Sequence, residues 1–220
     1  AGYFDRVQAV LKKYDILFVA DEVITGIGRT GNWWATDTFG LQPDIVTSAK
    51  GLGAGMVPIG AAIISERVHE TIMKMSDQYG VYTQGSTFSG NPLATAMALE
   101  TLTIIEEENL ITHGTELGKI FLDAMTGANE HEMLADVSSV GALTSAELMK
   151  DPEKRVPFDA SVNILGVFGK HCENERVAVR LNSNRVIFAP ALNMTFEEAE
   201  EAVRRFHRAL DATWKEVKGK

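Results

Sequence analysis

Cysteine is almost absent from this sequence, since Cys172 is the only one among 220 residues. A single cysteine excludes an internal disulfide and a zinc site built from several cysteines, and it favours a reducing, cytoplasmic setting. Long hydrophobic runs are also missing. The longest has about ten residues, whereas a membrane-spanning helix needs about 20. No signal-peptide pattern opens the chain.

Positive charge is in deficit. The chain carries 21 lysines and arginines against 30 acidic residues, which gives a net charge of -9. Nucleic acids and anionic membranes would be repelled, so neither is expected as a partner. A small anionic ligand stays possible because it needs only a local positive site. The contents of 45% hydrophobic and 23% charged residues are typical of a globular protein.

The first half of the chain predicts an α/β sheet. A helical pattern over residues 3–14 precedes three unbroken apolar runs, at residues 16–23, 45–49 and 59–65. Short runs of this kind are typical of buried strands, and the first has the pattern of a parallel strand with polar residues at its carboxyl end. We therefore expect three buried strands separated by loops and short helices.

The character of the sequence changes from Asn91. Pro92 stands at the start of a long amphipathic pattern, which predicts a helix, and a second helix is expected over residues 112–125. A capping-box spacing at Thr195 and Glu198 predicts a last helix that runs to about Val217. Strands are expected at residues 133–137, 142–148, 177–181 and 186–189. The pattern indicates a smaller α+β domain over 106–220, with the boundary near residue 105.

Two charged residues follow two of the predicted strands. Asp21 ends the first run and Lys50 follows the second, and glycine-rich segments come after both. Ligands of open α/β sheets bind at the carboxyl ends of strands. A lysine among apolar and glycine neighbours can have its pKa lowered and attack aldehydes. Taken singly, Asp21 could cap a turn and Lys50 could be a solvated loop lysine.

A dinucleotide-type pattern is present as well, at Gly26, Gly28 and Gly31. The NAD interpretation requires the first glycine directly after a strand and a helix that opens on the third. Residues 21–25 intervene here, and an Asn-Trp-Trp sequence is a poor helix start. The context therefore disfavours NAD. An HExxH-like zinc motif at His69 is incomplete because Met73 replaces the second histidine.

Three ordered motifs, DEVITGIGRTG, PDIVTSAKGLGAG and TQGSTFSGNPLA, carry a family resemblance. Together with the last segment, FAPALNMTFEEAEEAVRRFHRAL, they resemble the class III (omega) aminotransferases of the fold type I pyridoxal-phosphate enzymes. The resemblance covers essentially the whole chain. It implies the C-terminal part of the large mixed-sheet cofactor domain at residues 1–105 and a small C-terminal domain at 106–220. It also implies pyridoxal phosphate as the cofactor.

The resemblance implies catalytic roles for two residues and a packing role for a third. Asp21 matches the acid that pairs with the pyridinium nitrogen and keeps the ring an electron sink. Lys50 matches the lysine that holds the cofactor as a Schiff base and later transfers a proton. Val23 matches an aliphatic residue packed on one face of the ring, a role compatible with that of an ordinary core valine.

The third motif implies a homodimer. Thr87 matches a threonine that binds the cofactor phosphate across the dimer interface, and its neighbour Ser86 is a second candidate. If this role holds, each active site is shared between two subunits. The segment taken alone reads as a turn that leads into the long helix.

A substrate-binding residue is implied at Arg180, which matches an arginine that binds the substrate carboxylate in the omega-amine branch. A guanidinium can hold a carboxylate by two parallel hydrogen bonds. The alternative is a surface arginine at a strand end. Arg29, in the glycine-rich loop, is better explained as a structural residue.

The sequence departs from the family pattern at four positions. Ile24 stands where ornithine and GABA enzymes have a glutamine, and Ile187 replaces their arginine for the α-carboxylate. Both changes favour ω-amino acids or amines as donors, with pyruvate as the acceptor keto acid. Ser138 and Ser139 replace an arginine and a glycine, with no consequence evident from the sequence.

The expected function is thus that of a transaminase acting on small molecules. Family members are considerably longer, and their N-terminal half carries part of the phosphate site and much of the substrate pocket. We therefore expect the 220-residue chain to be inactive alone. Two alternatives stay open: a non-catalytic fragment or pseudoenzyme that serves as a dimerisation module, and another pyridoxal-phosphate reaction on the same fold, such as that of a mutase or a decarboxylase.

Overall fold

The computed structural model describes residues 2–82, 84–127 and 131–218. The chain packs as two compact units, residues 1–110 and 111–220. Each is described by itself. No helix within the described residues combines the length and apolar character needed to cross a bilayer.

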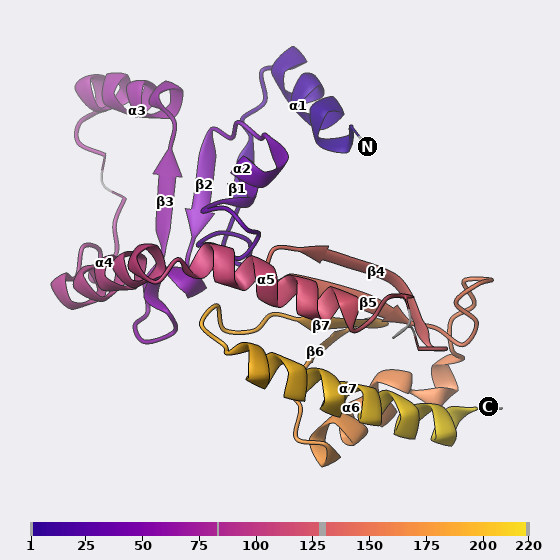
Figure 1. The fold of residues 1–220 in the computed structure, drawn as a ribbon. Helices are drawn as coiled ribbons and strands as arrows, with labels where there is room; N and C mark the ends of the chain where they lie inside the picture. Colours follow the sequence, from indigo (N-terminus) through magenta and orange to yellow (C-terminus); the bar gives the residue numbers. More distant parts are fainter. Residues whose placement is uncertain (1, 83, 128–130, 219–220) are drawn as a thin grey trace. The chain divides into compact units, whose positions relative to one another are not determined.

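The N-terminal unit is built around a three-stranded sheet of order β1-β2-β3 (Figure 1). Strands β1 and β2 are parallel and β2 and β3 are antiparallel, so the sheet is mixed, as expected from the sequence. In chain order, the elements are α1 (Tyr3–Lys13), β1 (Val19–Asp21), α2 (Ala35–Phe39), β2 (Ile45–Ser48), the 3-10 helix η1 (Lys50–Gly53), β3 (Ala61–Ile64), α3 (Glu66–Tyr79) and α4 (Pro92–Glu107).

The start of α4 follows from its sequence. The Asn91 side chain accepts hydrogen bonds from the backbone N–H groups of Leu93 and Ala94, at 3.0 and 3.1 Å. Pro92 occupies the first helical position, where a missing N–H costs nothing. The helix therefore begins where the sequence predicts.

The prediction that all three strands are buried is wrong for the described chain. Val19 in β1 keeps 53% of its surface exposed, and every residue of β3 is exposed. Apolar runs show that a strand can be buried, but the covering surface has to come from elsewhere. The described residues leave these side chains largely uncovered.

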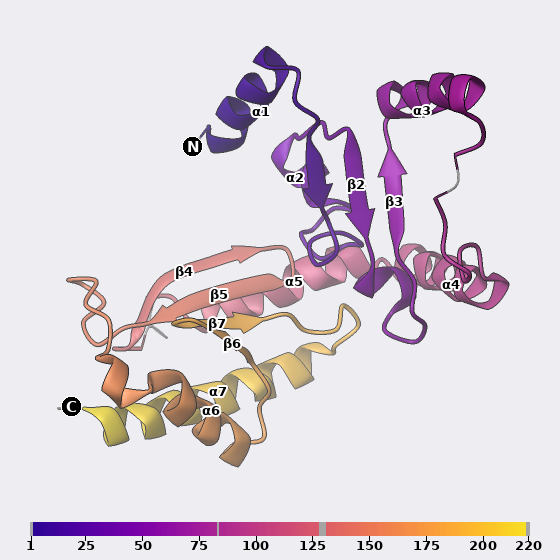
Figure 2. The same ribbon diagram turned by 180° about the vertical axis from the view of Figure 1, so that it is seen from behind.

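The C-terminal unit is a two-layer α+β structure. Its antiparallel sheet has the order β4-β5-β7-β6, and α5 and α7 lie on the same side of it (Figures 1 and 2). Its elements are α5 (Leu110–Asp123), β4 (Leu134–Val140), β5 (Leu143–Leu148), the 3-10 helix η3 (Ala160–Val162), α6 (Ile164–Asn174), β6 (Arg180–Asn182), β7 (Arg185–Phe188) and α7 (Phe196–Val217).

The core of this unit lies between the sheet and its helices. Three phenylalanines, Phe168, Phe188 and Phe206, pack edge to face, with ring centroids 4.9 and 5.8 Å apart. Cys172 lies in the same cluster, where burial raises the pKa of its thiol to about 12. The thiol therefore stays protonated and sheltered at neutral pH, so its chemical labelling reports unfolding of this unit.

Most element ends of this unit lie within two residues of the expected ones, but β4 runs on to Val140 instead of ending at Val137, and β6 starts late. Thr195 and Glu198 form the predicted capping box at the start of α7. Residues 177–179 were expected in a strand, but β6 begins only at Arg180. The N–H of Val177 donates to the carbonyl oxygen of Cys172 at 3.0 Å, so this segment still completes the end of α6.

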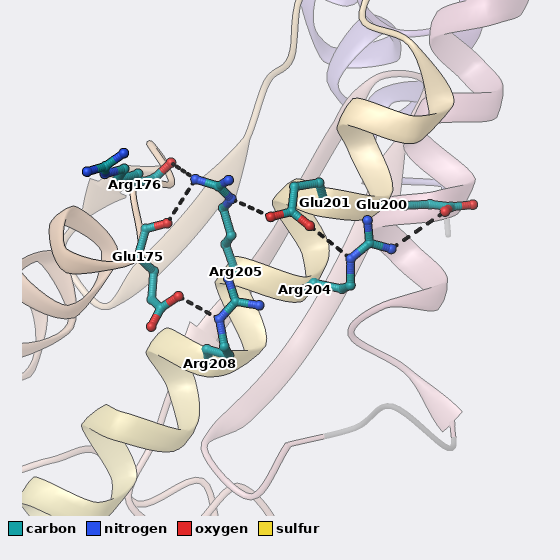
Figure 3. A network of polar contacts seen from close by, with 7 residues as sticks. All are labelled: Glu175, Arg176, Glu200, Glu201, Arg204, Arg205 and Arg208. Atoms are coloured by element: carbon teal, nitrogen blue, oxygen red, sulfur yellow. Dashed lines mark hydrogen bonds and ion pairs between the residues drawn. The ribbon is translucent and has the colours of Figure 1, made fainter.

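A network of arginines and glutamates connects α7 to the end of α6 (Figure 3). Arg205 donates to Glu201 on its own helix at 2.8 Å and to the carbonyl oxygens of Glu175 and Arg176 at 3.3 and 3.5 Å. Because these carbonyls lie at the C-terminal end of α6, the guanidinium caps that helix. Arg204, by contrast, forms its ion pairs with the described residues only to carboxylates of α7, those of Glu200 and Glu201.

Replacing Arg205 by glutamine should therefore destabilise the C-terminal unit by about 1 kcal/mol, because two carbonyl oxygens lose a charged donor. The matched change Arg204→Gln should cost about 0.3 kcal/mol, the value of an exposed pair within one helix. The urea concentration at which Cys172 becomes available to a thiol reagent measures both. Equal shifts for the two variants would contradict the capping role.

A second prediction concerns pH. Burial lowers the pKa of His131 from the ordinary value of 6.5; Asp211 and Glu132 oppose the shift, and His207 adds to it. The N–H of Met133 donates to Nδ1 of His131 at 3.1 Å, which requires an unprotonated nitrogen there. The unfolded chain takes up this proton at a higher pH than the native chain. Neutral His131 therefore makes its full contribution to the free energy of unfolding above pH 6.5. That contribution is lost as the pH falls below 6.5.

The urea midpoint of the C-terminal unit should accordingly decrease from pH 7 to pH 5, and His131→Gln should make that decrease shallower. The variant His69→Gln removes an exposed imidazole of α3 and serves as the control. Unfolding followed at Cys172 across this pH range measures the slopes. A slope unchanged by His131→Gln would refute the assignment.

Candidate functional site

Asp21 is the last residue of β1 and pairs with Thr47 of β2 across the sheet. Its oxygen Oδ1 accepts two hydrogen bonds, one from the N–H of Val23 at 3.0 Å and one from the hydroxyl of Thr47 at 3.1 Å. The other oxygen, Oδ2, accepts none from the described residues. The carboxylate is exposed at the carboxyl edge of the sheet, so one of its oxygens is held and the other is open to a ligand.

Lys50 follows β2 at the same edge of the sheet, because β1 and β2 are parallel. It begins η1 with a φ of 38°, in the left-handed region that non-glycine residues rarely adopt. Strained backbone of this kind is concentrated at functional sites. The side chain is exposed and makes no hydrogen bond or ion pair with the described residues. A free amine and a free carboxylate oxygen therefore share one sheet edge.

Glu22, which the sequence did not single out, anchors the loop beside these residues. It is 2% exposed, and its carboxylate accepts hydrogen bonds from the N–H groups of Ala35 and Thr36 at 3.0 and 2.7 Å and from the hydroxyl of Thr25. The carboxylate thus caps α2 and closes the glycine-rich loop. Only the three-dimensional position of α2 identifies this role, since thirteen residues separate Glu22 from Ala35.

The glycine-rich loop supports the turn that carries Lys50. Ile27 is buried, and its side chain lies so near Gly51 that a Cβ there would be 3.2 Å from Ile27 Cβ. The loop and η1 thus pack closely at position 51, where any larger residue would push against the Ile27 side chain. The loop continues as turns up to α2, which starts at Ala35, so the helix that the NAD pattern requires at Gly31 is not formed. Burial lowers the pKa of Arg29 in this loop.

A shallow apolar pocket of about 450 Å³ lies on the other face of the sheet. Ser48, Ala61 and Ile63 line it, and the strand register places all three opposite Thr47 and therefore opposite Asp21. Trp33, Trp34 and residues of α4 complete it. The pocket thus does not contain the paired acid and lysine.

The turn before α4 presents Thr87. Ser86 is fixed by Ser89, whose hydroxyl accepts the Ser86 N–H at 2.9 Å and lies 3.2 Å from the Ser86 hydroxyl. Thr87 is exposed and forms no hydrogen bond with the described part of the chain. The loop therefore holds Ser86 internally and leaves the Thr87 hydroxyl and N–H available.

Arg180 and Arg185 differ although both lie at strand ends of the C-terminal unit. Arg180 opens β6 at the sheet edge and pairs with Ile187 through its backbone, but its exposed side chain has no hydrogen bond or ion pair with the described residues. Arg185 is engaged: it donates to Asp136 Oδ2 at 2.8 and 3.1 Å and to Glu147 at 3.2 Å. Asp136 has a φ of 47° and lies at an irregularity of β4. The hydrogen bonds from Arg185 hold Asp136 in this conformation. Of these two guanidinium groups, only that of Arg180 has no hydrogen bond or ion pair with the described residues.

The two serines that depart from the family pattern pair across β4 and β5. The hydroxyls of Ser138 and Ser145 lie 3.2 Å apart, and those of Ser139 and Thr144 lie 2.8 Å apart. Thr144 also donates to the carbonyl oxygen of Gly118 on α5, at 3.4 Å. These serines thus serve strand pairing and the attachment of α5.

Comparison with known proteins gives a consistent result. The family model described as Aminotransferase class-III matches residues 1–210. Gamma aminobutyrate transaminase 2 of Solanum lycopersicum is 36% identical over 217 residues, which cover 99% of this chain and 47% of that protein. Gamma aminobutyrate transaminase 3, chloroplastic, of the same plant is 35% identical over 97% of this chain and 41% of its own length. The chain thus spans about half the length of these relatives.

A solved structure agrees with these matches. The omega transaminase from Pseudomonas jessenii in complex with PMP is 36% identical, with a TM-score of 0.94. The match covers 100% of this chain and 49% of that one. The sequence matches and the structural match are therefore both to transaminases.

Proposed function

Because the chain belongs to the class III aminotransferase family, whose members use pyridoxal phosphate, we propose that the whole protein transfers an amino group from an ω-amino acid or amine to a keto acid, with pyruvate as acceptor. One observation carries the proposal: Asp21 and Lys50 lie at one edge of the sheet, each with an unpaired polar group. The proposal concerns the whole protein, of which this chain matches about half.

The residues at this edge fit the cofactor. A pyridinium N–H needs an acceptor. Both donors that reach Asp21 bind Oδ1, and no donor among the described residues reaches Oδ2, so Oδ2 can accept it. The cofactor aldehyde needs an amine, and the Lys50 amine has no partner among the described residues. When bound, pyridoxal phosphate supplies an aldehyde that condenses with amines and a ring that withdraws electrons from the substrate carbon.

The chain's own residues take distinct roles in this proposal. Lys50 Nζ holds the cofactor and moves a proton at the substrate carbon. Asp21 keeps the ring nitrogen protonated, and Val23 packs against a ring face. Ser86 and Thr87 bind the phosphate, where the free Thr87 hydroxyl is the better placed donor. Arg180 holds the substrate carboxylate.

The homodimer with a shared active site belongs to the same proposal. Helix α4 and the turn before it expose apolar side chains: Phe88 is 78%, Leu93 68% and Leu99 67% exposed. Large apolar side chains that stay exposed close together on one segment are typical of a surface that binds another protein. A second subunit on this segment would bury these residues and bring Thr87 to the partner's cofactor.

Two sets of relatives bear on the choice of donor. The plant relatives are named for gamma-aminobutyrate, itself an ω-amino acid, and the bacterial neighbour is named an omega transaminase. Ile24 and Ile187, in place of glutamine and arginine, argue against GABA. We therefore propose only the general class of amino donor, and an assay with several donors has to identify the member of that class that reacts.

Borohydride reduction of the whole protein with pyridoxal phosphate, followed by peptide mapping, tests the proposal. We expect a pyridoxyl group on Lys50 and transfer from ω-amino acids or amines to pyruvate. GABA, β-alanine and an arylalkylamine should be compared as donors. Absence of the label on Lys50, or a labelled protein without any transfer, would reject the proposed function.

A complementation experiment tests the shared site. Lys50→Ala and Thr87→Val subunits, each of low activity alone, would regain about one quarter of the wild-type activity when refolded together in equal amounts. About half of the dimers are then mixed, and one of the two sites in each mixed dimer is intact. No gain over the sum of the two variants would contradict a shared site.

A further inference from the structure

Thr47 is the side chain that holds the Asp21 carboxylate. The two residues are direct partners in the parallel ladder of β1 and β2, and the Thr47 hydroxyl donates to Asp21 Oδ1 at 3.1 Å. The Val23 N–H donates to the same oxygen at 3.0 Å. Two donors from different parts of the chain thus converge on one oxygen.

The position of the Thr47 hydroxyl is itself well determined. The N–H of Glu22 donates to the carbonyl oxygen of Thr47 at 2.9 Å, which continues the strand pairing beyond Asp21. A β-branched side chain has few rotamers, so a threonine in a paired strand keeps its hydroxyl in one place. The terminal torsion of an aspartate is broad, and an exposed carboxylate would otherwise rotate.

We infer that Thr47 is a positioning residue that fixes the Asp21 carboxylate with Oδ2 turned toward the cofactor ring nitrogen. The inference rests on the proposed function, since only a ring N–H gives the free oxygen a use. With the hydrogen bond from the Val23 N–H alone, Oδ1 would be held at one point and the rest of the Asp21 carboxylate could still rotate. The hydroxyl of residue 47 supplies the second contact that stops this rotation.

The neighbouring residue offers a matched control. Ser48 is the next residue of β2, but its side chain points to the opposite face, and its buried hydroxyl has no hydrogen-bond partner among the described residues. Removing this hydroxyl changes the same strand without touching Asp21. Thr47→Val removes the hydroxyl at nearly constant volume, whereas Thr47→Ser retains it.

The test compares the affinities of the whole apoprotein for two cofactors, pyridoxal phosphate and its carbocyclic analogue, in which carbon replaces the ring nitrogen. Thr47→Val should raise the dissociation constant for pyridoxal phosphate about tenfold and change that for the analogue less than about twofold. Thr47→Ser and Ser48→Ala should both stay within about twofold of the wild type for either cofactor.

The outcomes separate the inference from the proposed function. If Thr47→Val binds pyridoxal phosphate as tightly as the wild type, or weakens both cofactors equally, the positioning role is refuted. The first result would mean that the Thr47 hydroxyl has no role in cofactor binding. The second would mean that its role is only structural. If the wild-type protein fails to bind pyridoxal phosphate, or Asp21→Asn binds it unchanged, the proposed function itself fails.

Discussion

Lys50→Ala should reduce the rate of amino transfer by the whole protein by at least about ten-thousand-fold, because in the proposed function the same amine is both the covalent attachment point and the proton carrier. The effect exceeds that of any other single change at the site, since no other described side chain at this sheet edge offers an amine. Single-turnover rates and the pyridoxyl content after borohydride reduction measure it.

Two further variants show what the loss means. Lys50→Arg keeps the positive charge, but a guanidinium is a poor nucleophile, so it should be as inactive as the alanine variant. Lys74→Ala removes an exposed lysine of α3, whose ammonium lies 3.9 Å from Glu70, and should leave the rate unchanged. Substantial activity in Lys50→Arg would mean that charge alone is required and would overturn the assignment.

Gly118→Ala should destabilise the C-terminal unit by about 3 kcal/mol or more, because the new Cβ has no space. Gly118 lies in α5, where a Cβ would overlap the carbonyl oxygen of Gly141 in the turn between β4 and β5. The obstacle is backbone on both sides. The helix therefore has to move off the sheet, and the hydrogen bond from Thr144 to the Gly118 carbonyl is lost with it.

Gly114→Ala, one helical turn earlier, is the matched control. Its Cβ would lie 2.7 Å from Cδ2 of Leu192, which is the end of a flexible side chain and can turn away. Alanine also favours the helix by about 1 kcal/mol relative to glycine. We therefore expect little net change. Urea unfolding followed at Cys172 compares the two variants, and a Gly118→Ala midpoint close to that of Gly114→Ala would disprove the clash.

The sequence predicted the paired acid and lysine because their positions follow from strand direction alone. Asp21 ends one apolar run and Lys50 follows the next, and parallel neighbours bring their ends to one edge. It did not identify Thr47 or Glu22. The partner of Thr47 depends on the register between two strands, and that of Glu22 on where a loop returns. Neither can be read from a single run of residues.

The sequence also could not predict which strands are buried or which arginines form ion pairs. An apolar strand such as β3 has the same pattern whether or not a neighbour covers it, so the expectation of burial failed there. Arg180 and Arg185 look alike in sequence, yet only Arg185 is occupied by Asp136 and Glu147. In both cases the answer lies in what surrounds the residue, which pattern and periodicity do not contain.

Within the described part of the chain, the residues of the buried hydrophobic cluster all come from positions 117–217. Free energies of substitution add when two sites share no partners. Asp21, Lys50 and Arg180 are all outside this cluster. Natural or laboratory selection for thermal tolerance can therefore act on cluster residues without replacing any residue of the proposed site.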